Sequence, residues 1–545
     1  MTMHFTKCRL LRQIPSRPCF LFRCISTTPS PKSSQWQGVV GLEIHAQIAA
    51  KSKLFSGSGT TFSAPTNTQV SLFDCATPGT LPVLNRRCVE AAALTAMALN
   101  CTLHPVSTFD RKHYFYADLP TGYQITQRFQ PIATNGWMEY AMYVVDRDKE
   151  PRMRKVGIEQ LQLEQDSGKS FHNAKDGYSL IDLNRAGIGL MEIITRPEFE
   201  NGEQAAFFVR ELTLILRELG VCDVKMFEGS LRVDANISVR RPGDPLGVRS
   251  EVKNLASAKF VNRAVDYEIA RQIKLKESGG EVVNETRGFD LSTSTTFPMR
   301  DKEILQDYRY MPEPNLPPLR LFDSYSGQTV PEHQVDIATL RTRLPEPPAA
   351  KRQRYIQELK LTPAQAVTLI SAEGLPKLFE GILQNAKSPK TTPTNVAKHL
   401  LTVALATLND LHDTLVNRQV DAQQVAVLID MLHEERLPRV IFVKLLDQLV
   451  KQPDEIRDVE EHVIRNNFLQ VNDEARLGAW CDQVILSHPD KVELVRKGKD
   501  RVLNFLTNEV KILSEDRANL RQTKVLLDKK VRGDGPVILN EDKVK

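Results

Sequence analysis

The period of the hydrophobic pattern changes along this chain, and the change limits which folds it can adopt. From about Trp36 to Arg320, short segments alternate apolar and polar residues between Gly/Pro turns, which indicates strands with two different faces. Beyond about Glu346, apolar residues recur at helical spacing with short connections, and strand patterns largely disappear. The sequence therefore predicts an α+β protein with a β-rich N-terminal part and a helical C-terminal part.

Length and pattern together predict several domains. A chain of 545 residues exceeds what one ordinary hydrophobic core accommodates. We predict a leader over 1–35, a mixed or antiparallel β-rich cradle domain with helices over 36–325, an all-α helical domain over 326–395 and a helical tail domain over 396–545. Because no apolar run approaches the roughly 18 residues of a spanning helix, we expect no transmembrane segment.

The first residues have the composition of an organelle transit peptide. Between Met1 and Leu42 there is no Asp or Glu, while basic residues are spread among hydrophobic and Ser/Thr residues. The basic residues are Lys7, Arg9, Arg12, Arg17, Arg23 and Lys32. We predict import into the mitochondrial matrix; a basic tail without targeting function is the alternative.

Two helices are predicted inside the β-rich part. Over Glu203–Leu219, a single apolar stripe includes Phe208 and Leu212, and Gly220 stands where it would end the helix. A second helix is predicted from about Ser257 to Ser278, ended by two glycines. The Pro-rich run over 311–318 predicts a boundary or a rigid loop, because proline removes a hydrogen-bond donor.

Several predicted strands carry acidic residues on one face. In VVGLEIHAQI, Glu43 and His45 share the polar face, an arrangement that a half-solvated strand would also explain. The segments LQLEQD, LRVDANISVR and RSEVKN show the same alternation, and the last two predict a hairpin. Together the segments offer Glu43, His45, Glu164, Asp166, Asp234 and Glu251.

So many carboxylates on adjoining strands would repel one another unless a cation lay among them. Mg²⁺ suits such oxygen ligands, with His45 as an outer or occasional ligand, and four cations could neutralise phosphates: Lys112, Lys253, Arg300 and Arg309. Separate solvated faces are the alternative, and spacing alone would also fit a metal-dependent nuclease or phosphatase. Phosphate-loop, nucleophile-elbow and zinc-helix motifs are missing.

One basic turn stands out in the helical part. Arg496-Lys497-Gly498-Lys499 precedes a predicted helix, whose free N–H groups could hold a phosphate. A solvated helix end is the more common explanation of such a run.

The motifs, taken in order, resemble those of the B-subunit family of aminoacyl-tRNA amidotransferases. The motifs are VVGLEIH, GTLPVLN, FDRKHYFYADLPTGYQITQ, LEQDSGKS, LIDLNRAG, GSLRVDANISVR, EVKNL and DYRYMPEPNLPPL, within residues 37–320. Together they are highly specific, and the helical remainder is similar to the family's helical and tail domains through weaker motifs. The leader resembles that of a mitochondrial member.

The resemblance implies an enzyme that corrects Glu-tRNA(Gln) to Gln-tRNA(Gln). It implies ATP- and Mg²⁺-dependent activation of the glutamate carboxylate and amidation by ammonia from a partner glutaminase, the A-type protein of the complex, with a small C-type partner. The implied activity is a carbon–nitrogen ligase, glutaminyl-tRNA synthase (glutamine-hydrolysing). A non-catalytic tRNA-binding scaffold of the same complex is the alternative.

Matching motif positions assign roles to individual residues. The resemblance implies catalytic roles for Glu43, His45, Glu251 and Lys253, and metal ligands among Glu43, His45, Glu164, Asp166, Asp234 and Glu251. ATP or the aminoacyl end would contact Lys112, Tyr114, Asn236, Lys253 and Arg309, and tRNA phosphates would contact Lys497 and Lys499. One departure concerns Gln165, where the family often has Glu. If that Glu is a ligand in relatives, Gln165 would bind through a neutral oxygen and hold the metal more weakly.

Overall fold

The computed structural model describes residues 36–145, 147–173, 175, 177–299 and 308–533. The predicted leader over 1–35 and Arg300 lie outside the described residues. Packing divides the chain between Pro345 and Glu346 into two compact units. The boundaries predicted at 325/326 and 395/396 stay predictions.

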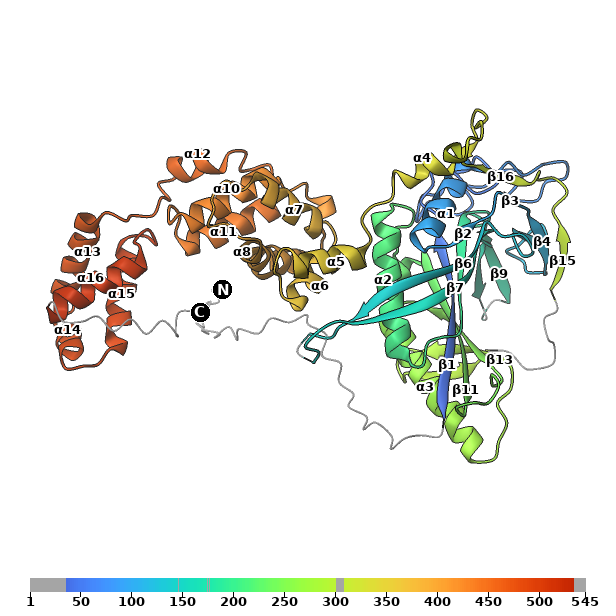
Figure 1. Ribbon diagram of the computed structural model, residues 1–545, viewed down its shortest axis with the longest axis horizontal. Helices are drawn as coiled ribbons and strands as arrows, with labels where there is room; N and C mark the ends of the chain where they lie inside the picture. The colour runs from blue at the N-terminus through green and yellow to red at the C-terminus, as the bar shows by residue number, and fades with distance from the viewer. Residues whose placement is uncertain (1–35, 146, 174, 176, 300–307, 534–545) are drawn as a thin grey trace, which may run out of the picture. The chain divides into compact units, whose positions relative to one another are not determined.

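A nine-stranded mixed sheet organises the first unit, in the order β14-β13-β12-β11-β1-β10-β7-β6-β2 (Figure 1). Its strands are β1 (Gln37–Gln47), β2 (Thr102–Leu103), β6 (Ala133–Met142), β7 (Arg152–Gln165), β10 (Gly189–Thr195), β11 (Leu231–Arg240), β12 (Ser250–Leu255), β13 (Glu285–Asp290) and β14 (Thr295–Pro298). Neighbours run antiparallel, except β12 and β13, which run parallel. The first strand of the described residues, β1, thus lies at the centre of the sheet between β11 and β10.

Three smaller sheets complete the β structure described in this unit. They are β15 (Arg309–Pro312) with β4 (Asp110–His113) and β5 (Tyr123–Thr126); β17 (Val335–Asp336) with β16 (Leu319–Phe322) and β3 (Val106–Ser107); and β8 (Lys169–Asn173) with β9 (Tyr178–Asp182). The Pro-rich run begins at the end of β15, where an edge strand tolerates Pro312, and continues as a loop.

Helices cover one face of the large sheet, where its apolar residues lie (Figure 1). The helical segments of this unit are α1 (Arg86–Ala98), α2 (Gly202–Glu218), α3 (Ala258–Glu277), α4 (Ile337–Arg341) and the short 3-10 turns at Met226–Glu228 and Ser324–Ser326. Val40, Leu42 and Ile44 of β1 are at most 1% exposed and share one core with Phe208 and Leu212 of α2. Because the apolar side is filled, the polar side of each strand faces away from the helices.

Both helices predicted inside the β-rich part are confirmed. Asn201 begins α2 by accepting the N–H of Gln204, and the Ser257 side chain begins α3 in the same way, caps that contribute about 1 kcal/mol each. The two helices pack closely at Gly202, where an added Cβ would lie 2.1 Å from the Asn262 carbonyl oxygen. A larger residue there would separate the two helices.

The second unit is helical. Its helices are α5 (Pro348–Gln357), α6 (Pro363–Ser371), α7 (Leu375–Asn385), α8 (Pro393–His399), α9 (Leu405–Leu411), α10 (Ala422–His433), α11 (Arg439–Lys451), α12 (Val459–Arg465), α13 (Glu474–Ser487), α14 (Pro489–Arg496), α15 (Arg501–Leu513) and α16 (Leu520–Arg532). A π-helical segment, Leu400–Ala404, joins α8 to α9, and a 3-10 turn covers Leu415–Asn417. The predicted α+β class, with a sheet-rich region followed by helices, is confirmed. Among the described residues, none of the helices has the length and apolar character needed to cross a bilayer.

Candidate active site

The register of three central strands brings the predicted polar residues onto one face of the large sheet. Glu43 of β1 lies opposite Asp234 of β11. Two residues further along β1, His45 lies between Arg232 of β11 and Glu192 of β10. Because facing residues in an antiparallel sheet point to the same side, these side chains share the face that the helices leave open.

A compact cluster of possible metal ligands forms where β1, β10 and β7 meet. His45, Glu164 and Glu192 each offer one ligand atom, and these atoms lie within 4.8 Å of one another. The distance between His45 Nδ1 and a Glu164 oxygen is 4.0 Å. Gln162 of β7 donates a hydrogen bond of 2.5 Å from Nε2 to Glu192. Two carboxylates and an imidazole at this spacing can hold a divalent cation.

Burial makes this cluster electrostatically costly. Glu164 is 3% exposed and Glu192 is 9% exposed. Burial, with the neighbouring Glu192 carboxylate, raises the pKa of Glu164 to about 7, against the opposing effects of Lys112 and His45. Burial also raises the pKa of Glu192, and the Glu43 carboxylate adds to that rise. A positive charge among these groups would relieve the cost of keeping both ionised.

One lysine from a neighbouring sheet supplies part of that charge. Lys112 of β4 shares a face with Gln124 of β5 and Tyr310 of β15. Its ammonium lies 4.7 Å from the ring centre of Tyr308. Burial alone would lower the pKa of Lys112, but the Glu164 carboxylate and others nearby raise it above its ordinary value. Lys112 therefore stays protonated beside the acidic cluster.

A second row of charges lies on β11 and β12. The predicted hairpin between these strands is confirmed, with Asn236 opposite Glu251. A bulge follows, in which Asn254 has φ of 60° and donates its N–H to Asp234 at 2.8 Å. Lys253 Nζ lies 3.1 Å from Glu251 and 3.9 Å from Asp234. These acids already have a cation between them, unlike the pair at Glu164 and Glu192.

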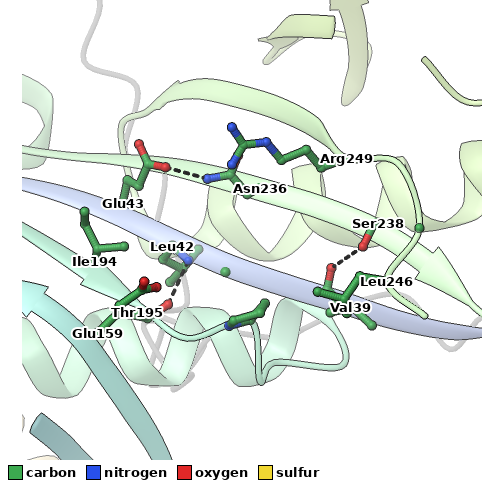
Figure 2. A pocket seen from close by; sticks show the side chains of 13 residues that line it. Val39, Leu42, Glu43, Glu159, Ile194, Thr195, Asn236, Ser238, Leu246 and Arg249 are labelled. Atoms are coloured by element: carbon green, nitrogen blue, oxygen red, sulfur yellow. Dashed lines mark hydrogen bonds between the residues drawn. The ribbon is translucent and has the colours of Figure 1, made fainter. Parts of the chain in front are cut away.

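An open cavity of about 270 Å³ continues the polar face beyond Glu43. Figure 2 shows Glu43 accepting a hydrogen bond of 2.8 Å from Asn236, and the Arg249 side chain extending toward that pair. Glu159 lines the cavity from the side of β7. Glu43 therefore stands between the cavity and the three-residue cluster.

Four predicted residues lie outside the three-residue cluster and make other contacts. Asp166 is 3% exposed and accepts from Arg232 at 2.9 Å, with Arg185 at 3.5 Å. Glu43, Asp234 and Glu251 occupy the same sheet face as the cluster without belonging to it. The metal role that the sequence assigns to these four acids stays a prediction.

Three further residues show how orientation separates candidates that the sequence groups together. Arg309 is exposed and pairs in β15 with His113, so it lies on the face opposite Lys112. Tyr114 donates its hydroxyl to Gln124 at 3.2 Å, beside the cluster face. Gln165 accepts the N–H of Ile125 at 3.3 Å, and alternation along β7 puts its side chain on the opposite face from Glu164.

The basic turn lies in the second unit. Lys497 follows α14 and pairs with Glu493 at 2.7 Å, with a side chain that is 66% exposed. Gly498 has φ of 85°, which lets the chain turn before α15. Lys499 is exposed in the same turn.

Sequence reasoning missed Glu192. In GLMEIIT it interrupts an apolar run at an alternate position, as Glu43 does in VVGLEIH, so the same signal was available. Gln162 was missed as well, because an uncharged amide on a polar strand face carries no distinctive chemistry. Their importance follows from register, with Glu192 opposite His45 on one side and Gln162 on the other.

Comparisons with known proteins cover both units. Residues 38–326 match the GatB/GatE catalytic domain, and residues 377–531 match the GatB domain. The chain is 45% identical over 500 residues to the mitochondrial B subunit of glutamyl-tRNA(Gln) amidotransferase from Danio rerio, covering 91% of this chain and 90% of the relative. For the Homo sapiens protein of the same description, identity is 44% over 499 residues, covering 91% and 89%. The B subunit of the aspartyl/glutamyl-tRNA(Asn/Gln) amidotransferase from Zymomonas mobilis subsp. mobilis is 40% identical over 502 residues, covering 91% and 97%.

Proposed function

Since the chain belongs to the B-subunit family of aminoacyl-tRNA amidotransferases, we propose that it amidates glutamate esterified to glutamine tRNA in a mitochondrial complex. The activity is that of a carbon–nitrogen ligase with glutamine as nitrogen donor, glutaminyl-tRNA synthase (glutamine-hydrolysing). The mitochondrial names of the similar animal proteins and the acid-poor leader support the location. Family membership also implies ATP use, partner proteins and a tRNA substrate.

The reaction needs activation because a carboxylate is a poor electrophile. A side-chain oxygen of the esterified glutamate attacks the γ-phosphorus of ATP, and ADP leaves, which gives an acyl phosphate. Ammonia then adds to the acyl carbon, inorganic phosphate leaves with the bonding electron pair, and loss of a proton from nitrogen gives the amide. Each step brings negatively charged oxygens together, so the site must position them and offset their charge.

The cluster of His45, Glu164 and Glu192 is the observation that carries this proposal. The two carboxylates are buried close together with raised pKa values, a donor set that suits a divalent cation. We assign Mg²⁺ to these three residues, which would hold it where its positive charge would offset that of phosphate oxygens. Gln162 holds Glu192 in place through its hydrogen bond.

Two lysines would hold the phosphates and the carboxylate. Lys112 is protonated beside the cluster and can pair with phosphate oxygens of ATP. Lys253, between Glu251 and Asp234, can do the same from the other side of β1. Tyr114 beside Lys112 would contact ATP or the aminoacyl end, and the role of Arg309 stays a prediction from sequence.

Ammonia and tRNA recognition require partners. The A-type partner, a glutaminase, would release ammonia from glutamine, and a small C-type partner would complete the complex. Lys497 and Lys499, both exposed, would contact phosphates of the tRNA body.

A reconstitution experiment separates this proposal from a scaffold without chemistry. Purified complex, glutamine, ATP and Glu-tRNA(Gln) should give Gln-tRNA(Gln), and EDTA should stop the reaction until excess Mg²⁺ is added. Complex containing Glu164→Gln should bind tRNA normally but form little product. If that variant forms product at the wild-type rate, the chain acts as a tRNA-binding scaffold and the assignment of the chemistry is wrong.

A further inference from the structure

The cavity beside Glu43 is lined by two charged residues, Arg249 and Glu159, to which no role has been assigned above. By strand order, Arg249 lies at its β12 side, Asn236 and Glu43 near its middle, and Glu159 at its β7 side (Figure 2). Gly41 lies in the floor between them, beside Pro197 of the segment after β10. Cationic and anionic groups therefore line one small cavity from different strands.

Two groups in this cavity have unused bonding capacity. The Asn236 Oδ1 atom is buried and has no hydrogen-bond partner, while Nδ2 of the same amide is occupied by Glu43. The Arg249 side chain is exposed, and within the described ranges its guanidinium makes no ion pair or hydrogen bond. A buried acceptor without a donor is destabilising, and a bound ligand with a donor would offset that cost. The cavity is thus lined by an amide whose oxygen has no partner and, within the described residues, by an unpaired bidentate cation.

We propose that this cavity binds the glutamyl group itself, with Arg249 pairing with its side-chain carboxylate and with Asn236 Oδ1 and Glu43 accepting from its α-ammonium group. An esterified glutamate carries those two charges, one positive and one negative, on one short chain. Arginine is suited to a carboxylate because its planar fork donates two parallel hydrogen bonds. The proposal rests on the amidation function above and identifies where that substrate is recognised.

The position of the cavity fits the reaction. Glu43 lines the cavity and lies two residues from His45 on the same face of β1, so the cavity adjoins the proposed Mg²⁺ cluster. A carboxylate held by Arg249 would remain on the face where phosphoryl transfer takes place. Gly41 leaves room for the group, because a Cβ at that position would lie 3.5 Å from Pro197 and extend into the cavity floor.

The proposal also explains how substrate and product are distinguished. Amidation converts the negative carboxylate into a neutral amide, which loses its charge-assisted pairing with Arg249. Such a pairing is worth about 1.5–3 kcal/mol, or roughly tenfold or more in affinity. The reaction therefore weakens binding at this cavity as it proceeds, and product leaves more readily than substrate.

The test uses the assembled complex and two non-hydrolysable probes. The probes are 3′-deoxyadenosine carrying either a glutamyl or a glutaminyl group through a 3′-amide, titrated by calorimetry. Wild type should bind the glutamyl probe about tenfold more tightly than the glutaminyl probe. Arg249→Gln should remove this preference. Arg241→Gln is the matched control, because Arg241 is an exposed arginine of the same hairpin turn and does not line the cavity.

A second variant tests the space in the cavity independently of charge. Gly41→Ala adds one carbon at ordinary contact distance from Pro197, so the fold is kept while the floor is raised. It should weaken both probes several-fold and leave their ratio unchanged. A tenfold preference that persists in Arg249→Gln, or Gly41→Ala binding both probes as wild type does, would overturn the proposal.

The same preparations separate failure of this inference from failure of the amidation function. If wild-type complex makes Gln-tRNA(Gln) while Arg249→Gln keeps the tenfold preference, the glutamyl-binding role alone is wrong. If wild-type complex makes no Gln-tRNA(Gln), the proposed function is wrong, and with it the substrate that the cavity would recognise.

Discussion

The polar face of the sheet and the basic turn of the second unit hold charge in opposite ways. Glu164 and Glu192 come from different strands, are nearly buried, and lie close enough to raise each other's energy. Lys497 is 66% exposed and pairs with Glu493 four residues earlier. The first arrangement depends on the whole sheet and calls for a compensating cation, whereas the second is local, solvated and screened by salt. Perturbations should therefore act far more strongly on the sheet than on the turn.

The largest effect should follow the change Glu192→Gln. Removing one ligand loses cation-dependent charge stabilisation worth several kcal/mol, so amidation by the complex should fall about a thousandfold. The unfolding free energy of the metal-free chain should not decrease, because one buried charge is gone. Product formation and urea unfolding measure the two results. Glu281→Gln is the control, since Glu281 is exposed in the first unit; equal activity losses in both variants would contradict the assignment.

The pH dependence of stability should distinguish the two regions next. Unfolded glutamate has a pKa of 4.5, whereas folded Glu164 has a pKa of about 7, so between these values the folded state holds a proton that the unfolded chain releases. Stability of the metal-free protein should therefore fall by about 2 kcal/mol between pH 5.5 and pH 8 through this group. Urea unfolding in EDTA measures the fall, which should be smaller in Glu164→Gln because only the contribution of Glu192 remains. An equal fall in that variant would show that Glu164 is not responsible.

A smaller effect should follow loss of the hydrogen bond that holds Glu192. Gln162→Leu should weaken Mg²⁺ binding about tenfold, because outer contacts orient a ligand without replacing it. Calorimetric titration with Mg²⁺ measures this change. The second unit provides a matched control: Gln448 donates to Glu455 at 2.9 Å in an exposed hydrogen bond. Gln448→Leu should leave Mg²⁺ affinity unchanged. A similar loss of Mg²⁺ affinity in both variants would contradict the proposal that Gln162 orients a metal ligand.

The smallest effect should come from the basic turn. Reversing the charges of Lys497 and Lys499 to Glu should weaken tRNA binding several-fold and make its logarithmic salt dependence shallower by about one to two units. Filter binding across a salt series measures both quantities. Reversal at Lys377 and Lys390, exposed elsewhere in the same unit, gives the comparison. If reversal of either pair weakens tRNA binding equally, the turn contributes only to the overall positive charge and is not a specific tRNA contact.

The local hydrophobic pattern of the sequence predicted the helices and strands, whereas the pairing of distant strands determines which residues form the site. The bounds of helices α2 and α3 were predicted closely because the apolar stripe and the ends of each helix depend on a segment of only about twenty residues. The polar faces of β1, β11 and β12 were predicted for the same reason. Which faces meet could not be predicted, because the pairing of β1 with β10 and β11 joins segments far apart in the chain.

Two residues show where pattern alone is insufficient. Glu192 lies in a short apolar run, so its alternation was less visible than that of Glu43, although it joins the ligand cluster directly. Arg309 is close to Tyr310 in sequence, but alternation puts the two on opposite faces of β15, and only Tyr310 shares the face of Lys112. Whether a charged side chain in a strand faces the site therefore depends on whether it occupies an odd or an even position of that strand.

The central position of β1 has a consequence for how the protein comes into being. Glu43 and Asn236, which share a hydrogen bond, are separated by 193 positions in the chain. During synthesis β1 therefore acquires neighbours on both sides only after β10 and β11 have been made. In a growing or partly translocated chain the proposed metal ligands would not yet lie together. Metal binding and catalytic activity would therefore appear in one step, when β10 and β11 pair with β1.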